Sequence, residues 1–232
     1  MSQIAVFELV KKFHYQPVLD HLSITLSDGN FCVLVGANGA GKTTLLRILA
    51  TLVRPDSGEI TVDGEWLGSR PSLRQRIGYI GHQTMFYHDL SALENLLHYA
   101  RLYQLPLSKE QAHQGISLAG LEKHQHKPIR AFSRGMLQRL SIARALLHEP
   151  DILLFDEPYT GLDQEAAVSL DKQLLRLHQP GRVILLAAHR PQRLIPFASH
   201  IAWLKDGKIS HHLPMSRISE APDLLAYLQE VP

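Results

Sequence analysis

The 232-residue sequence predicts an α/β fold with a mixed, largely parallel sheet as its core, an antiparallel β part near the N-terminus and an inserted all-α part. Short, continuous apolar runs recur, each followed by a loop and a helical pattern, as is typical of buried parallel strands: residues 31–35, 152–155 and 183–188. Shorter, partly alternating runs separated by tight turns predict antiparallel strands: residues 4–10, 18–26 and 59–62. We expect one domain over 1–232, with a core of 1–88 and 150–232 and a helical insert at 89–149.

The helical insert is predicted by capping signals and by apolar periodicity. Ser91 and Glu94 have the spacing of a capping box at the start of a helix. Two sets of apolar residues repeat at helical spacing and predict buried helix faces: Leu93, Leu96, Leu97 and Ala100 before Pro128, and Met136, Leu140, Ala143 and Leu147 after it.

Composition excludes several classes of protein. With 24 Lys plus Arg against 22 Asp plus Glu, the net charge of +2 provides little attraction for nucleic acid. No apolar run approaches the roughly 18 residues that would cross a bilayer, and the N-terminus lacks a signal-peptide pattern, so we expect a cytoplasmic chain. The single cysteine, Cys32, lies in an apolar run and is expected in the core.

Histidine is frequent, and two short segments contain two histidines each: residues 124–126 and 211–212. No Cys or carboxylate accompanies either cluster at the spacing of metal ligands. We therefore interpret both as exposed connecting segments and expect no metal there.

A phosphate-binding loop is predicted at residues 36–43, which match G-x-x-x-x-G-K-[ST] between the strand 31–35 and a helix at 44–52. Its glycines allow backbone N–H groups to surround phosphates, and the helix N-terminus adds partial positive charge. Lys42 is expected to reach the β- and γ-phosphates of ATP, and Thr43 to ligate Mg²⁺. The residues expected to contact nucleotide here are Gly36, Asn38, Gly39, Ala40, Gly41, Lys42, Thr43 and Thr44.

Two carboxylates follow the apolar strand 152–155. In a parallel sheet this end of the strand lies at the ligand-binding edge. We expect Asp156 to hold Mg²⁺ and Glu157, on the other side of the strand, to accept the proton of an attacking water.

With these motifs in order, the sequence resembles the nucleotide-binding domains of ABC transporters over nearly its whole length, which implies a P-loop NTPase fold with a RecA-like core. The resemblance implies that Phe13 stacks on adenine, with Tyr15 as the alternative. It also implies that Gln83 senses Mg²⁺ and the γ-phosphate, that His189 contacts the γ-phosphate, and that Asp163 belongs to the D-loop (160–163), which crosses to a partner subunit.

The family's signature loop corresponds to residues 132–136, read F-S-R-G-M. Ser133 is placed to cap a helix and Gly135 to permit close approach, so this helix N-terminus is expected to bind an anion. The resemblance implies that the anion is the γ-phosphate of ATP on another subunit, which requires a head-to-tail dimer, most simply a homodimer. Arg134 replaces a glycine of the family pattern, and Met136 replaces a glutamine that would add a polar contact near the nucleotide. We interpret these departures as harmless variation within the family; the alternatives for Arg134 are that it adds charge near the nucleotide or that its bulk forces it outward.

A membrane partner is implied because the chain has no predicted span, which places it peripherally at the cytoplasmic face of the inner membrane. Residues 85–87, Met-Phe-Tyr, follow Gln83 where the family docks a helix of its permease, and we expect Phe86 or Tyr87 at that rim.

The cargo is suggested by likeness. The S-R-G-M signature and the length ending near Pro232 resemble exporter ATPases, and residues 132–163 resemble the haem exporter ATPase of cytochrome c biogenesis (CcmA-type). Exporters of drugs, lipids or polysaccharides share the signature pattern, and an ABC ATPase acting as a switch without a transporter is a third alternative.

Overall fold

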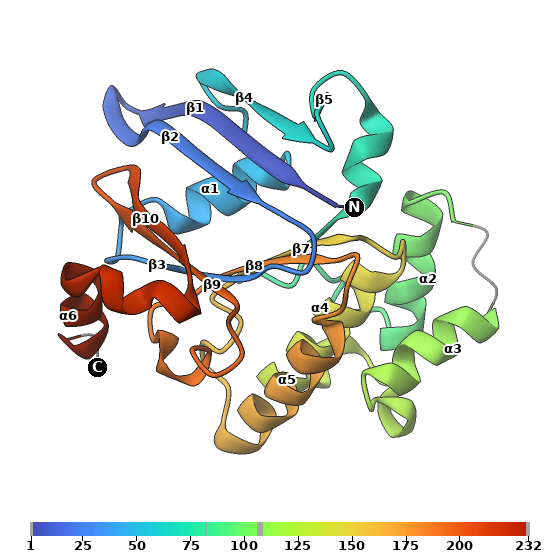
Figure 1. Ribbon diagram of the computed structural model, residues 1–232. Helices are drawn as coiled ribbons and strands as arrows, with labels where there is room; N and C mark the ends of the chain where they lie inside the picture. The colour runs from blue at the N-terminus through green and yellow to red at the C-terminus, as the bar shows by residue number, and fades with distance from the viewer. Residues whose placement is uncertain (1, 82, 106–108, 231–232) are drawn as a thin grey trace. The chain divides into compact units, whose positions relative to one another are not determined.

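The computed structural model describes residues 2–81, 83–105 and 109–230 (Figure 1). The chain forms two compact units. The first comprises residues 1–79, 151–157 and 177–232, and the second comprises 80–150 and 158–176. The second unit therefore contains the region of the predicted helical insert and, in addition, residues 80–88, 150 and 158–176.

The first unit contains an antiparallel sheet in the strand order β2-β1-β4-β5. Its strands are β1 (Ile4–Phe13), β2 (Gln16–Leu26), β4 (Ser57–Val62) and β5 (Glu65–Trp66). Ile4 pairs with Leu26 on one side and with Val62 on the other, so apolar side chains of three strands align on the inner face. This confirms the antiparallel β part predicted near the N-terminus.

A six-stranded sheet in the same unit has the order β10-β9-β3-β8-β7-β6. Its strands are β3 (Phe31–Val35), β6 (Ile77–Ile80), β7 (Ile152–Asp156), β8 (Val183–Ala187), β9 (His200–Lys205) and β10 (Lys208–Pro214). The pairs β3–β8, β7–β8 and β3–β9 are parallel, and β9–β10 is an antiparallel hairpin at the edge. The carboxyl ends of β3, β7 and β8 consequently lie at one edge of the sheet.

Helix α1 (Lys42–Leu49) lies between the two sheets of this unit (Figure 1). Leu45, Leu46, Ile48 and Leu49 are buried in one hydrophobic cluster with residues of β1, β2, β7 and β8. Cys32 is fully buried in that cluster, as expected, and burial raises the pKa of its thiol strongly. The unit also contains η1 (Pro71–Arg76), η4 (Pro191–Arg193), η5 (Met215–Glu220) and the helix α6 (Pro222–Glu230).

The interpretation of residues 211–212 as an exposed connection was wrong. His211 and His212 lie on β10 and are half-buried. The turn at Asp206 and Gly207, both with positive φ, folds β10 back along β9, so polar residues of β10 are covered on one side.

The second unit is helical and has its own core. It contains α2 (Ala92–Leu102), α3 (Lys109–Leu118), α4 (Arg134–Leu146), most of α5 (Gln164–Leu177), η2 (Glu122–His124) and η3 (Ile129–Ala131). Ser91 and Glu94 form the predicted capping box at the start of α2. The core cluster includes Leu96 and Ile116 together with Leu140 and Ala143, while Met136 and Leu147 pack against it, which confirms the predicted inward faces of α2 and α4.

Within the described ranges, no helix combines the length and the apolar character that crossing a membrane requires.

Candidate nucleotide-binding site

The loop predicted to bind phosphate connects β3 to α1 at the carboxyl edge of the six-stranded sheet. Gly41 is the N-cap of α1 with φ +106°, and no side chain caps this helix start. No acidic residue lies in the first turn. The backbone N–H groups of this turn therefore remain available to an anion, as a phosphate site requires.

Two glycines are required by close packing around this loop. A Cβ on Gly36 would lie 2.4 Å from the Leu204 carbonyl oxygen, and a Cβ on Gly41 would lie 2.9 Å from the Val18 carbonyl oxygen. The loop is thus held between β9 and β2, and any larger residue at either position would displace it.

The remaining loop residues form its outward surface. Asn38 and Gly39 are exposed, and Ala40 and Thr44 are half-buried. The Ala40 N–H donates to the Ala37 carbonyl oxygen at 3.2 Å, which closes a tight turn. These residues occupy the part of the loop that a nucleotide could reach.

Lys42 is buried, with 7% of its surface exposed. Its Nζ donates to the carbonyl oxygens of Gly36, at 2.7 Å, and Ala37, at 3.1 Å. Burial lowers the pKa of Lys42, and the carboxylates of Glu157 and Asp156 oppose that shift. The ammonium group is thereby held beneath the loop at the edge where phosphate is expected.

Thr43 and Asp156 meet directly although they lie 113 positions apart. The Thr43 hydroxyl donates to Asp156 Oδ1 at 2.9 Å, and Asp156 is 3% exposed. The second oxygen, Oδ2, accepts from the Tyr79 hydroxyl at 3.2 Å. A hydroxyl and a carboxylate at one point form the oxygen donor set that Mg²⁺ prefers.

Tyr79 was not predicted as a site residue. Its hydroxyl also bonds to Arg47 of α1, and burial together with the charge of Asp156 raises the pKa of Tyr79. The hydroxyl therefore keeps its proton and remains a donor to Asp156. The apolar sequence around Tyr79 did not indicate a partner for its hydroxyl. That partner, on β7, lies beside β6 only because the two strands are neighbours in the folded sheet.

Glu157 and His189 lie together at the ends of β7 and β8. The Glu157 N–H donates to the Ala187 carbonyl oxygen at 3.1 Å, and Glu157 Oε2 accepts from the His189 N–H at 3.1 Å. Glu157 has φ +52°, in the left-handed region that costs a non-glycine residue energy and is concentrated at functional sites. The backbone thus turns sharply after Asp156, so the carboxylates of Asp156 and Glu157 point in different directions.

His189 also has an unpartnered atom. Its Nδ1 is buried, and no hydrogen-bond partner for it exists in the part of the chain that the structure describes. A buried polar atom without a partner is costly, so an external group such as a phosphate oxygen or water would stabilise it. The orphan nitrogen, the oxygen pair at Asp156 and the uncapped helix together fit a magnesium-bound nucleotide.

A second unpredicted residue, Tyr227 of α6, reaches the same loop. Its hydroxyl is hydrogen-bonded with the backbone of Gly36, and its ring stacks on Trp203 of β9 with centroids 5.1 Å apart. Burial raises the pKa of Tyr227, and the carboxylate of Glu157 adds to that increase. No sequence motif marks Tyr227, since its partner lies 191 positions earlier.

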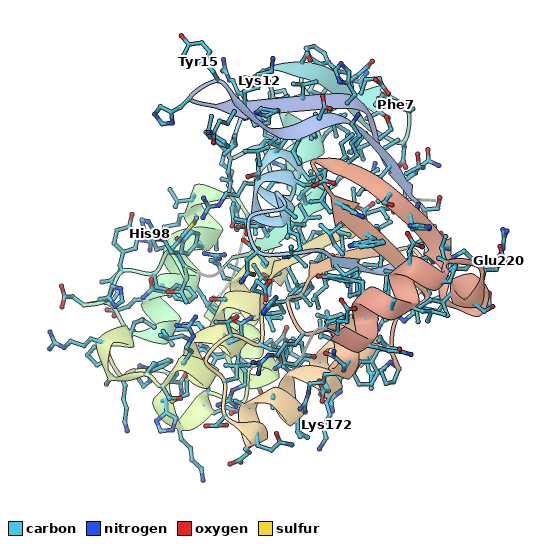
Figure 2. All side chains as sticks on the ribbon, turned by 90° about the vertical axis from the view of Figure 1, so that its left-hand side faces the viewer. Phe7, Lys12, Tyr15, His98, Lys172 and Glu220 are labelled. Atoms are coloured by element: carbon cyan, nitrogen blue, oxygen red, sulfur yellow. The ribbon has the colours of Figure 1, made fainter. Side chains whose placement is uncertain are left out.

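Two aromatic residues compete for the adenine position at the β1–β2 hairpin. Phe13, at the end of β1, is 45% exposed and has Lys11 Nζ 5.3 Å from its ring centroid. Tyr15 is 98% exposed and extends from the hairpin away from the unit (Figure 2). The Phe13 ring is therefore partly surrounded by other residues, as a stacking site for adenine requires, whereas the Tyr15 ring has almost no neighbours.

The remaining predicted residues lie in the second unit. Ser133 is the N-cap of α4, as expected, and its hydroxyl accepts from the Met136 N–H at 3.3 Å. A Cβ on Gly135 would lie 2.8 Å from Ala166 Cβ, so this glycine permits close approach of α4 to α5. Asp163 accepts from the Ala166 N–H at 2.8 Å and thereby caps α5.

The segment after β6 contains Gln83, which is exposed. Of the three large residues that follow, Phe86 is buried against Tyr99, with ring centroids 6.2 Å apart. Met85 and Tyr87 are about half exposed, and Tyr87 lies edge-to-face with His98 of α2, which Figure 2 labels. Phe86 therefore belongs to the core of this unit, and Tyr87 to its rim.

Comparison with known proteins decides the family. The family model described as ABC transporter matches residues 19–160, more than half of the chain. The chain belongs to the ABC transporter family. Its fold agrees with a solved dimeric ATP-binding cassette in a post-hydrolysis state, bound to ADP and Pi: the TM-score is 0.81 at 26% identity, over 91% of this chain and 98% of the other. This ABC protein is accordingly an ATP hydrolase and the ATPase subunit of an ABC transporter.

Relatives of this ABC ATPase have different transport roles. The bacitracin transport ATP-binding protein BcrA of Bacillus licheniformis is 33% identical over 94% of this chain and 71% of its own length. The ABC transporter ATP-binding protein NatA of Bacillus subtilis is 34% identical, over 86% and 83%. The cytochrome c biogenesis ATP-binding export protein CcmA of Cupriavidus necator is 36% identical, over 74% and 76%.

Proposed function

We propose that this ABC ATPase works as a homodimer bound to a separate membrane subunit, at the cytoplasmic face of the cell membrane, and that it powers the export of haem for cytochrome c biogenesis. The observation that carries the ATPase chemistry is the meeting of Thr43, Asp156, Glu157 and His189 at one edge of the sheet. These groups come from α1, from the end of β7 and the residue after it, and from the segment after β8.

Each group at this edge has a distinct role in hydrolysis. Thr43 and Asp156 would hold Mg²⁺, which neutralises charge on the phosphates, and the role of Gln83 toward Mg²⁺ stays a prediction from the family resemblance. Lys42 provides a fixed positive charge beneath the loop. Glu157 accepts the proton of the attacking water, and His189, whose backbone N–H orients that carboxylate, uses its free Nδ1 toward the γ-phosphate.

The homodimer is supported by the second unit's helix α4. Ser133 caps this helix, and the helix N-terminus favours an anion. The similar solved cassette is dimeric with ADP and Pi bound. We therefore assign Ser133, Gly135 and Asp163 to the nucleotide of the partner copy, and Phe13 to the adenine of its own.

The permease is proposed to bind at Met85 and Tyr87. These exposed apolar side chains flank the buried Phe86 and follow Gln83 directly, so a docked helix would be linked through the chain to a nucleotide-sensing residue. Burial of Met85 and Tyr87 against a permease helix would explain why this surface is apolar.

Haem as cargo is supported by the likeness of residues 132–163 to the CcmA type and by 36% identity to a CcmA protein. Export of a peptide antibiotic is the second candidate, because the similarity to the bacitracin transport protein extends over 94% of this chain.

Copurification from native membranes tests the partner and the cargo together. The tagged chain should bring down a multispanning subunit, and after reconstitution in lipid nanodiscs haem should stimulate ATP hydrolysis while bacitracin should not. Stimulation by bacitracin alone would replace the haem assignment with the second candidate. A fully active ATPase that purifies with no membrane protein would refute the transporter partnership.

A further inference from the structure

The side chain of Arg134, the first residue of α4, turns toward its own chain. Its Nε donates to the Thr160 carbonyl oxygen at 2.8 Å. A Cβ on Gly161 would lie 2.8 Å from both Cδ and Nε of Arg134, and 3.3 Å from its Cζ. The guanidinium end of the side chain thus lies directly against the Cα of Gly161, within the D-loop.

The segment that receives this bond is a tight turn. The Leu162 N–H donates to the Tyr159 carbonyl oxygen at 3.1 Å, so Thr160 and Gly161 are the two central residues. Gly161 has φ +74°, the value expected at the third position of a type II turn. Type I and type II turns differ by a flip of the central peptide, whose carbonyl is that of Thr160. The Arg134 bond therefore selects one orientation of that peptide.

Three neighbouring contacts make the rest of this region rigid. Gly135 lets α4 approach Ala166 of α5, as the 2.8 Å position of its absent Cβ shows. Asp163 caps α5, and the Tyr159 hydroxyl donates to Asp171 Oδ1 at 2.7 Å. Both ends of the turn are consequently anchored to α5, and Arg134 anchors its centre to α4.

We propose that Arg134 is a positioning residue that holds the D-loop turn against the signature helix of the same chain, so that the two loops meet the partner copy as one surface. This inference rests on the proposed head-to-tail homodimer for its functional consequence. Arg134 acts through Thr160 and Gly161, which distinguishes it from a residue that binds the triphosphate itself.

Hydrogen exchange of the isolated monomer without nucleotide tests the contact itself. In Arg134→Ala the peptide covering 159–163 should exchange faster, about threefold or more, because one charge-assisted bond to the turn is lost. Arg134→Lys should restore part of the protection, since an ammonium can reach the Thr160 carbonyl but cannot lie flat against Gly161. Arg101→Ala, which removes an exposed arginine from α2 of the same unit, is the matched control and should leave this peptide unchanged.

ATP-dependent dimerisation in the hydrolysis-deficient Glu157→Gln background tests the consequence. A dimer contains two such turns, so a threefold effect at each predicts a dimer dissociation constant about tenfold higher for Arg134→Ala, with a smaller increase for Arg134→Lys. ATP affinity of the monomer should stay the same, which a direct role at the triphosphate would not allow. In the wild-type background, Arg134→Ala should lower kcat by a larger factor than it changes KM for ATP.

The two ways of failing are distinct. If Glu157→Gln itself does not dimerise with ATP, the proposed homodimer is wrong. If it dimerises and Arg134→Ala does so equally well, or if exchange at 159–163 is unaltered in the monomer, Arg134 does not position the D-loop.

Discussion

Replacing Tyr79 with Phe removes one hydroxyl from the carboxylate proposed to hold Mg²⁺. Asp156 is almost fully buried, and both of its oxygens accept hydrogen bonds within the described residues: Oδ1 from Thr43 at 2.9 Å and Oδ2 from Tyr79 at 3.2 Å. A hydrogen bond to a charged group contributes about 1.5–3 kcal/mol, and the length of this one favours the lower limit. About 1.5 kcal/mol corresponds to roughly a tenfold loss of Mg²⁺ affinity, which is also the lower limit for residues that orient metal ligands.

The assay is ATP hydrolysis as a function of free Mg²⁺ at saturating ATP. For Tyr79→Phe the half-saturating Mg²⁺ concentration should rise about tenfold, while the rate at saturating Mg²⁺ stays close to that of the wild type. Tyr103→Phe removes a hydroxyl from a half-buried tyrosine of the second unit and is the matched control. An unchanged Mg²⁺ requirement in Tyr79→Phe would refute the role of this hydroxyl in orienting Asp156.

Further substitutions test the other groups. Glu157→Gln should bind ATP normally and reduce hydrolysis by at least about a hundredfold, because the proton acceptor is lost; single-turnover rates near the wild-type value would exclude Glu157 as the base. Lys42→Ala should weaken ATP binding, measured by calorimetry, because it removes a buried charge and leaves two carbonyl oxygens without their donor. Tyr227→Phe frees the Gly36 backbone and should raise KM for ATP several-fold with little change in the thermal midpoint, which differential scanning fluorimetry would check. Burial lowers the pKa values of His200 and His212, whose ring centroids lie 5.8 Å apart, so the unfolded state binds more protons than the folded state at mildly acidic pH. Stability should therefore be fully present above the unfolded pKa of about 6.5 and decline as the pH falls through it. Urea titrations at pH 7.5 and 5.5 should show this loss, and His212→Gln should reduce it; an equal loss in the variant would contradict the assignment.

Local signals in the sequence were sufficient for much of the site's framework. The loop 36–43 could be predicted because its glycines, lysine and threonine are contiguous, and a strand and a helix flank it. The Ser91 and Ser133 caps were predicted for the same reason, since an N-cap depends on residues within three positions. The helix α1 begins two residues before its predicted start, inside the phosphate loop, because Gly41 rather than a side chain ends the loop.

The edge hairpin β9–β10 could not be predicted in the same way. Its two histidines suggested an exposed connection, but β10 pairs with β9, and His211 Nε2 lies 3.5 Å from Asp223 Oδ1 of α6. Met136 departs from the family's signature pattern, and it packs against the hydrophobic cluster of the helical unit, on the helix face that the sequence predicted to be buried.

The sequence by itself therefore determined the class of chemistry, because phosphate loops, strand-end carboxylates and helix caps are built from neighbouring residues. Only the tertiary structure decided which side chains support that chemistry. Tyr79 reaches Asp156 across 77 positions because β6 and β7 share a sheet, and Tyr227 reaches Gly36 because α6 returns to the first unit's loop edge. The direction of Arg134 was open in the sequence and was decided by a carbonyl 26 positions away, since a long, flexible side chain takes the partner that the fold places within its reach.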